Sequence, residues 1–526
     1  MATGSRLALR SMQRRFWLSL SLAFAVAIAA CAQVAGLGAY EKVDCLDDCA
    51  EAGAGDVNVE PAVDGNLEAQ PPSNCAGTST RCNGACVELS TDVDNCGTCG
   101  ASCGTAACCQ GACANTTLSP MNCGACGVTC LGTEACTAGA CRLLALGNGA
   151  DGPLAITADT TIDGVLTGAL SIPAGTRVAS VASTAGFAAG DLMLLHQTRG
   201  PGAGTYELGT VEKIDTVAST ITVARAVTHG FSSAGTARAQ AVRIPEYTTV
   251  SVAAGATLTA PPWDGTSGGI LVFEATGAVD VAGAVDMTGR GFRGFSHAPA
   301  CAGGARYACT SADTADGFAG ESAAGPALVS NAANGGGGGG SQDGQDCGAG
   351  AGGGHGTAGT AGTNGAGGVC RAAPQLGGAA GTTAGVDDLS IALLFGGAGG
   401  EGGGDEDGAY PGGGGNGGGI ISIAAQSVTV SGVLRANGAT GANGVQVSAG
   451  CGGSGCGMGA GGGGAGGAIF VQATATVSLG ANLVTAAGNG GGACTCGGMP
   501  GGSGGSGRIA VKGSVTGSTN PPFVAK

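Results

Sequence analysis

Residues 419–434 read Gly-Ile-Ile-Ser-Ile-Ala-Ala-Gln-Ser-Val-Thr-Val-Ser-Gly-Val-Leu, and this stretch decides the fold. Short runs of β-branched residues alternate with glycine, a pattern typical of strands that meet at tight corners. The pattern recurs at residues 269–285 and 467–483 and begins again at 507–515. Units of three short strands that repeat in this way predict coils that stack into a parallel β-helix, with an irregular β-sandwich as the alternative.

Composition shifts divide the rest of the carboxyl-terminal part. Residues 142–245 carry branched runs separated by Gly, Pro, Asp and Ser, which predicts a small β module. We expect the first β-helix coils at 246–294, a glycine-rich insert at 295–418, and further coils with glycine-rich loops at 419–526. The sequence therefore predicts an all-β fold with a parallel β-helix-like, glycine-rich body.

Glycine accounts for 111 of the 526 residues and aromatic residues for only 3%, so small aliphatic side chains must form the core. Two structures are open for the glycine-rich segments: disorder, because glycine loses much backbone entropy on ordering, or packed strands in polyproline II-like geometry. Eight cysteines from Cys301 to Cys496 lie in these segments. Disulfides between them would join neighbouring loops.

Residues 75–141 contain a second repeat, built on cysteine. Five cysteines recur 27 residues later in the chain. The first copy holds Cys82, Cys86, Cys96, Cys99 and Cys103, and the second holds Cys109, Cys113, Cys123, Cys126 and Cys130. Each copy has almost no large apolar side chain, so disulfides must replace a hydrophobic core. We take these ten cysteines as disulfide candidates.

Zinc is the alternative for this region, because Cys96 and Cys99, like Cys123 and Cys126, have the spacing of zinc ligands. The two pairs are 23 residues apart, extra cysteines flank each pair, and the segment has no histidine. An exported chain also meets an oxidising compartment. We therefore favour a small disulfide-rich repeat region in front of the β-helical body, without a metal.

The first copy, residues 82–103, has the form Cys-x-Gly-x-Cys-Val-x-Leu-x-Thr-Asp-x-x-Asn-Cys-Gly-x-Cys-Gly-x-x-Cys. This string resembles the cysteine repeat of myxobacterial-type secreted lipoproteins that carry a glycine-rich β-helical surface domain. The second copy departs from it after Cys113, where Ala-Asn-Thr-Thr-Leu replaces Val-x-Leu-x-Thr. The resemblance implies a location and an architecture, not an activity.

The amino terminus predicts export. Residues 1–30 combine four arginines with an apolar run from 16 to 30, and Ile-Ala-Ala-Cys at 28–31 forms a lipobox. Cys31 is then the lipidated first residue of the mature protein, with cleavage after Ala29 by an ordinary signal peptidase as the alternative. Residues 31–74 are an acidic linker without hydrophobic periodicity.

Candidate chemistry is sparse. Gly-x-Ser-x-Gly matches at 265–269 and 501–505 precede strands instead of following them, so they do not indicate a nucleophile. The acidic residues at 405–407 suggest at most adventitious calcium. Polysaccharide-cleaving β-helices use carboxylates with a basic residue, and the nearest equivalents are Asp280, Asp286, Arg290 and Arg293. We expect no catalytic, cofactor-binding or metal residues.

The net charge of −15 disfavours nucleic acid as a partner. The sequence therefore predicts an outer-membrane lipoprotein of the cell envelope with a structural or adhesive role. Its expected partners are the membrane, through the lipid, and extracellular matrix or polysaccharide. The alternative is a glycan-binding or polysaccharide-degrading β-helix protein.

Overall fold

The computed structural model divides the chain into two compact units, Met1–Ser73 and Asn74–Lys526. It describes residues 75, 77–119, 121–128, 134–137, 139–143, 146–162, 164–295, 317–326, 333–339, 348–365, 376–403, 411–444, 459–480, 483–485, 487–492 and 499–525. The predicted signal, lipidated Cys31 and acidic linker lie outside the described residues, as do Cys130 and the eight cysteines from Cys301 to Cys496.

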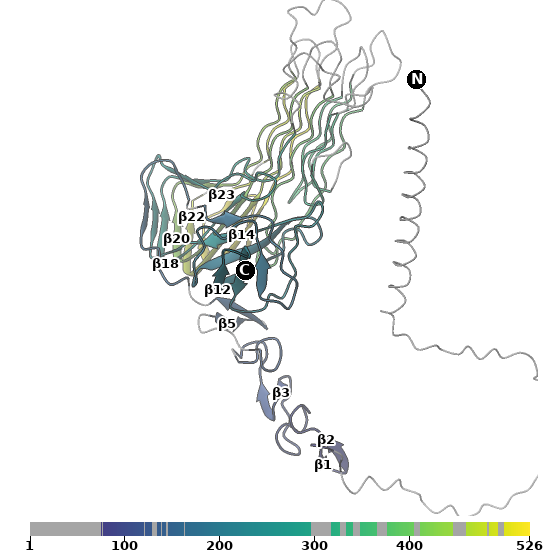
Figure 1. Cartoon of the computed structure of the whole chain (residues 1–526). Helices are drawn as coiled ribbons and strands as arrows, with labels where there is room; N and C mark the ends of the chain where they lie inside the picture. The colour runs from purple at the N-terminus through teal and green to yellow at the C-terminus, as the bar shows by residue number, and fades with distance from the viewer. Residues whose placement is uncertain are drawn as a thin grey trace, which may run out of the picture. The chain divides into compact units, whose positions relative to one another are not determined.

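The described residues contain strands and no helix, so the all-β prediction is confirmed. In particular, they include no helix that is long and apolar enough to cross a membrane. The body is built on two parallel sheets, drawn side by side in Figure 1. The parallel β-helix-like architecture is therefore confirmed.

The first parallel sheet consists of β7 (Leu154–Ile156), β16 (Val250–Val252), β18 (Ile270–Val281), β20 (Ile420–Val430), β22 (Ala468–Leu479), β24 (Arg508–Thr516) and β26 (Val524–Ala525), with β15 (Glu246–Tyr247) also pairing with β18. The second consists of β8 (Thr160–Thr161), β17 (Thr257–Thr259), β19 (Ala284–Asp286), β21 (Val433–Arg435), β23 (Leu483–Val484) and β25 (Thr519–Asn520). Strands follow the chain order in both sheets, as stacked coils require.

Each coil uses one long and one short strand instead of the three short strands expected from the sequence. β18 runs through both of the first two expected strands, and its register shifts between Ala275 and Ala278. The next strand, β20, shows the same irregularity between Ala425 and Val428. A bulge bends a strand while the ladder continues on both sides of it, so the chain turns this corner without ending the strand.

Aliphatic columns fill the space between the two parallel sheets. Val279, Val428 and Val477 are register partners in successive coils, and all three are fully buried. Val285, Leu434 and Leu483 form a matching buried column from the second sheet. Because each residue packs on its equivalent one coil away, small aliphatic side chains make a continuous core without large rings.

An antiparallel sheet is inserted between the first two coils. It consists, in sheet order, of β10 (Val178–Ser180), β13 (Thr220–Val223), β12 (Tyr206–Asp215), β11 (Leu192–Arg199), β14 (Arg238–Ile244) and β9 (Leu166–Thr167). Every residue of β11 is buried. One face of β11 packs in a cluster with Leu170 and Phe231, and the other packs toward Trp263 and Phe395 of the body.

The glycine-rich segments form the third side of the coils, visible in Figure 1 as a sheaf of extended traces. Every third N–H of residues 459–467 donates to the same neighbour. One set donates to residues 397–403, the next to 499–505 and the last to 436–442, with N···O distances from 2.7 to 3.3 Å. A three-residue repeat with all hydrogen bonds directed to neighbouring segments is the pattern of packed polyproline II helices. Of the two structures left open by the sequence, the described segments adopt the packed one.

Close approach of backbones explains why these segments are glycine. A Cβ on Gly462 would collide with the carbonyl oxygen of Ala351, and a Cβ on Gly464 with that of Asn416. The same holds at most described glycines of the bundle, where the obstructing atom is a backbone carbonyl that cannot rotate away. The bundle therefore needs glycine for the absence of a side chain, as the crowded axis of collagen does.

Substituting Gly462 with alanine should destabilise the protein by about 2 kcal/mol or more, because the methyl group has no space and the backbones must separate. Chemical denaturation followed by circular dichroism measures the loss. Gly325→Ala is the matched control, since a Cβ there meets no atom within 4 Å. Equal stability of the two variants would contradict close packing of the bundle.

Candidate functional site

The cysteine-rich region is disulfide-bonded. It forms three two-stranded hairpins: β1 (Thr80–Cys82) with β2 (Ala85–Val87), β3 (Ala107–Cys109) with β4 (Ala112–Ala114), and β5 (Glu134–Thr137) with β6 (Ala140–Leu143). Six disulfides join Cys75 to Cys86, Cys82 to Cys99, Cys96 to Cys108, Cys103 to Cys113, Cys109 to Cys126 and Cys123 to Cys136. Nine of the ten candidate cysteines lie in these bonds, and Cys130 is outside the described residues.

The connectivity follows the repeat. The bond from Cys82 to Cys99 closes a loop inside the first copy, and its equivalent 27 residues later joins Cys109 to Cys126. Two other bonds start at Cys96 and Cys103 of the first copy and end on the second hairpin. Their ends on that hairpin couple one copy to the next.

Sequence reasoning missed Cys75, Cys108 and Cys136 as partners, because a constant 27-residue offset leaves Cys108 unmatched. The signal lay in hairpin register instead. Cys108 faces Cys113 across the second hairpin, and Cys136 faces Cys141 across the third. Cys136 is therefore the counterpart of Cys108, with one residue inserted before it.

The asparagine and glycine of the repeat motif shape its loops. The side-chain oxygen of Asn95 accepts a hydrogen bond from the N–H of Gly100 at 2.9 Å, and Asn122 does the same for Gly127 at 2.8 Å. Gly100 and Gly127 both have a φ of +79°, a conformation that favours glycine. The motif Asn-Cys-Gly-x-Cys-Gly thus encodes one turn that positions two cysteines.

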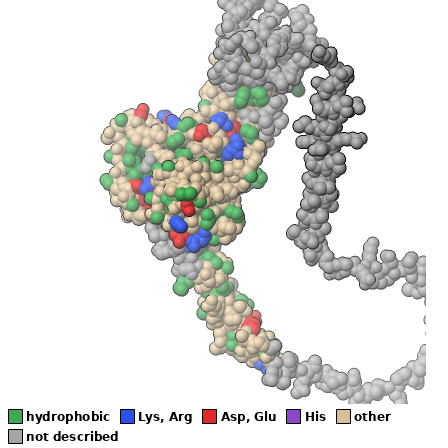
Figure 2. Space-filling view, in the orientation of Figure 1, with side chains coloured by type: hydrophobic (Ala, Val, Ile, Leu, Met, Phe, Trp, Pro, Cys, Tyr) green, Lys and Arg blue, Asp and Glu red, His purple; other side chains and the backbone are tan. Residues whose placement is uncertain are grey.

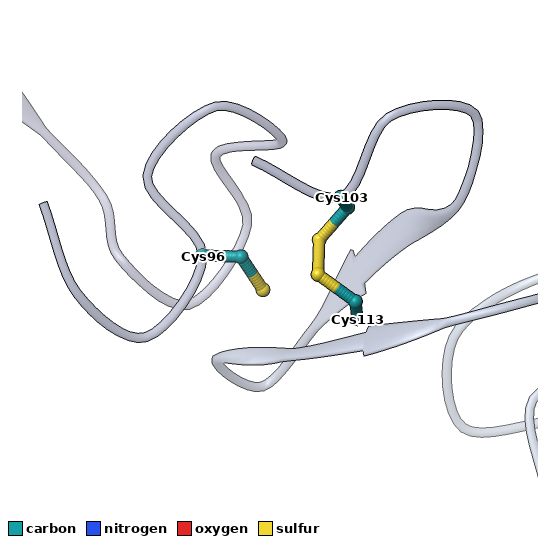
Figure 3. A group of neighbouring side chains, drawn as sticks. All are labelled: Cys96, Cys103 and Cys113. Atoms are coloured by element: carbon teal, nitrogen blue, oxygen red, sulfur yellow. A yellow bond between two sulfur atoms is a disulfide. The ribbon is translucent and has the colours of Figure 1, made fainter. Parts of the chain in front are cut away.

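Three sulfurs in this region approach one another as metal ligands would. The Sγ atoms of Cys96, Cys103 and Cys113 lie within 4.8 Å of each other, as Figure 3 shows. Cys103 is bonded to Cys113, and Cys96 is bonded to Cys108. Zinc binds thiolates, and a disulfide sulfur carries no thiolate charge, so the oxidised cluster does not fit the zinc alternative.

An open cleft of about 290 Å³ lies on the outer side of the second parallel sheet. It is lined by Asp159, Thr160, Thr161, Thr257, Thr259, Asp286, Thr288 and Arg290. Thr161 pairs with Thr259 in register, and Asp286 pairs with Arg435, so these residues form a polar column across successive coils. Strand spacing places the steps of such a column ~4.8 Å apart.

Some polar groups of the cleft are used by the fold and others face solvent. Thr259 donates to the backbone oxygen of Asp286 at 2.6 Å, and Arg290 donates to that of Ala260 at 2.9 Å. Among the described residues, the hydroxyls of Thr161 and Thr257 have no hydrogen-bond partner. The cleft thus offers donors and acceptors to a polar ligand without rearrangement.

The four residues considered for polysaccharide cleavage do not form one site. Asp286 and Arg290 line the cleft together, whereas Asp280 lies exposed on β18 of the other parallel sheet. Arg293 instead binds the buried carboxylate of Glu321, with an Nε···Oε2 distance of 3.0 Å. The arrangement does not place two carboxylates on either side of a bond to be cleaved.

Glu321 joins three parts of the body. Its buried carboxylate pairs with Arg199 from the antiparallel sheet and with Arg293 after β19, and it accepts a hydrogen bond from Trp263 Nε1 at 3.0 Å. A buried carboxylate without partners is costly, so this set of partners fixes where the glycine segment that carries Glu321 meets the sheets. The site is a structural junction.

The described histidines do not form a catalytic group. His196 is buried between Thr198 and the backbone oxygen of Leu393, and burial lowers its pKa to about 4. His355, buried in the glycine bundle, has a pKa lowered to about 4 for the same reason. Both are therefore neutral at physiological pH. His229 sits at the surface against Glu207.

Two carboxyl groups meet where the chain enters the body. Glu246 and Glu274 are register partners on neighbouring strands. Glu246 accepts hydrogen bonds from the N–H and side chain of Asn148. Within the described structure, Glu274 Oε2 is buried without a partner. Burial, together with the neighbouring Glu246, raises the pKa of Glu274 to about 7.

This raised pKa predicts a stability that falls as pH rises. The folded state keeps the Glu274 proton up to a pKa of about 7, whereas the unfolded chain releases it near 4.5, so stability is lost between these values. The loss is on the order of 3 kcal/mol. Glu274→Gln should flatten the profile between pH 5 and 8 in denaturation experiments. Asp280→Asn, an exposed change on the same strand, is the control, and an unchanged slope in Glu274→Gln would refute the assignment.

Comparisons with known proteins touch parts of the chain. Residues 68–144 match the model of the Stigma-specific STIG1-like protein family. No curated protein matches the chain significantly. Among solved structures, the tailspike protein gp49 from Pseudomonas phage LKA1 is similar at 14% identity and a TM-score of 0.15, over 26% of this chain and 27% of that chain. The chain thus spans about a quarter of the tailspike it matches.

Proposed function

We propose that the protein is a lipid-anchored component of a bacterial cell envelope with a structural or adhesive role, of the myxobacterial lipoprotein type. The observation that carries this proposal is the cross-linking of both folded parts. Disulfides connect successive cysteine repeats, and backbone hydrogen bonds connect glycine segments that are far apart in the chain. Extended cross-linking of this kind suits a protein that bears load or resists proteolysis.

The location follows from the amino-terminal sequence. The arginines, the apolar run and the lipobox ending at Cys31 favour export and lipidation, and the acidic linker favours a tethered body. Cross-linked cysteines fit an oxidising compartment outside the cytoplasm. The lipid makes the membrane the first partner, and we place the protein at the outer membrane with its body facing outward.

A second candidate function is glycan binding, favoured by the cleft on the second parallel sheet. Its column of hydroxyl, carboxylate and guanidinium groups matches the donors and acceptors of a linear polysaccharide. Charges on the face shown in Figure 2 occur in small mixed groups and not as one field, which favours a neutral ligand over a polyanion. Binding without cleavage is the form that the separated carboxylates support.

Protease treatment of intact cells tests the location. We expect peptides from residues 142–526 to be released before a periplasmic control protein is degraded. Cys31→Ala should remove the lipid and move the protein from the membrane fraction to the soluble fraction. Protection of the body until the envelope is broken would contradict the outward orientation, and membrane retention of Cys31→Ala would contradict lipidation.

Removal of two hydroxyls tests the glycan cleft. Thr161→Val with Thr257→Val should weaken binding of the mature chain to a neutral polysaccharide by roughly tenfold, at about 1 kcal/mol per lost hydrogen bond. Affinity electrophoresis in gels containing the polysaccharide measures the change. Thr429→Val makes the same chemical change at an exposed position of β20 and should leave mobility unchanged. Equal retardation of all variants would reject the cleft.

A further inference from the structure

Two disulfides that couple the cysteine repeats lie against each other. The Sγ atom of Cys96, bonded to Cys108, lies within 4.8 Å of both sulfurs of the bond between Cys103 and Cys113. In Figure 3 the sulfur of Cys96 points toward that second bond. Both disulfides run from the first copy of the repeat to the second hairpin. The pair is therefore the described covalent link between these two copies.

The two bonds differ in access to solvent. Cys113 is exposed and Cys103 is partly exposed, whereas Cys96 and Cys108 are buried. A thiolate from solution reaches Cys113 and is excluded from Cys96. Disulfide exchange depends on access to the attacked sulfur, so it begins at Cys113.

The backbone already places the alternative partners together. Cys108 and Cys113 are directly opposite each other across the hairpin of β3 and β4. Opposite residues in an antiparallel pair have Cβ atoms roughly 4.5–5.5 Å apart, near the range that a disulfide spans. On the other side, Cys96 and Cys103 belong to one loop. It is closed by hydrogen bonds from Cys96 N–H to Ala101 at 2.7 Å and from Cys103 N–H to Val93 at 2.8 Å.

We propose that this pair is a disulfide-exchange site, at which a small thiol or dithiol catalyst converts the two inter-copy bonds into two intra-copy bonds. The catalyst thiolate attacks Cys113, forms a mixed disulfide and releases Cys103 as a thiolate. Cys103 attacks Cys96, which forms the Cys96–Cys103 bond and releases Cys108. Cys108 attacks Cys113 in the mixed disulfide, which forms the Cys108–Cys113 bond and returns the catalyst thiolate.

The sequence of exchanges is balanced. Two disulfides are present before and after it, no electrons are gained or lost, and the catalyst is regenerated. What changes is the connectivity, because Cys96 and Cys103 both belong to the first copy, while Cys108 and Cys113 both belong to the second hairpin. The isomer keeps its disulfide content but uncouples the two copies, so the repeat region can lengthen under tension.

The test uses the mature chain with Cys113→Ser, which leaves Cys103 as a thiol from the start. We expect Cys103 to displace Cys108 from Cys96, so that alkylation labels Cys108 and the Cys96–Cys108 linked peptide is lost. Labelled positions are assigned by peptic digestion and electron-transfer fragmentation, because residues 87–113 contain no lysine or arginine for tryptic cleavage. Label that stays on Cys103 would overturn the proposal.

Cys99→Ser is the matched control. It frees Cys82, and neither Cys82 nor Cys99 belongs to a three-sulfur group among the described residues, so the label should remain on Cys82. If Cys113→Ser fails to fold, the wild-type chain treated with a substoichiometric thiol gives the same answer. A new Cys96–Cys103 linkage supports exchange, and reduction of the Cys103–Cys113 bond with Cys96–Cys108 intact rejects it.

Discussion

Direct hydrogen bonding between glycine backbones is the constraint on which the body depends. Residues 459–467 donate in rotation to three neighbouring segments, and this rotation is available only when no Cβ separates the backbones. Ordering glycine costs more backbone entropy than ordering any other residue. That cost is offset collectively, because the hydrogen-bonding groups of one segment satisfy those of several others. The bundle is therefore stable as a whole, not segment by segment.

The parallel sheets supply the anchors that such a bundle needs. Each outgoing glycine segment begins directly after a short strand, and each returning segment leads into a long one, as residues 436–444 follow β21 and 459–467 precede β22. The buried valine and leucine columns fix the height of each coil, and this height fixes the register of the glycine segments. Glu321 adds a charged junction where the bundle, the antiparallel sheet and the coils meet.

The sequence predicted the elements that side chains encode. Alternating aliphatic residues at 419–434 predicted strands in stacked coils, and cysteine spacing predicted a disulfide-rich region. The bundle geometry was only one of two options, because a run of glycine carries no side-chain pattern that separates order from disorder. The cleft was half visible for a similar reason. Asp286 and Arg290 lie on one sheet, but Asp280, close to them in sequence, precedes a corner and faces outward from another.

Disulfide pairing shows most clearly what a linear reading lacks. A fixed offset aligned Cys136 with Cys109, whereas hairpin pairing aligns it with Cys108, because one inserted residue shifts the register. The same pairing places Cys108 beside two possible partners. In the body, connectivity is set by backbone hydrogen bonds that must be lost together before the segments change neighbours. In the repeats it is set by individual sulfur atoms, so a single exchange alters it without unfolding a domain. The two folded parts thus meet the shortage of large apolar side chains in different ways, and only the cysteine solution can be rewired locally.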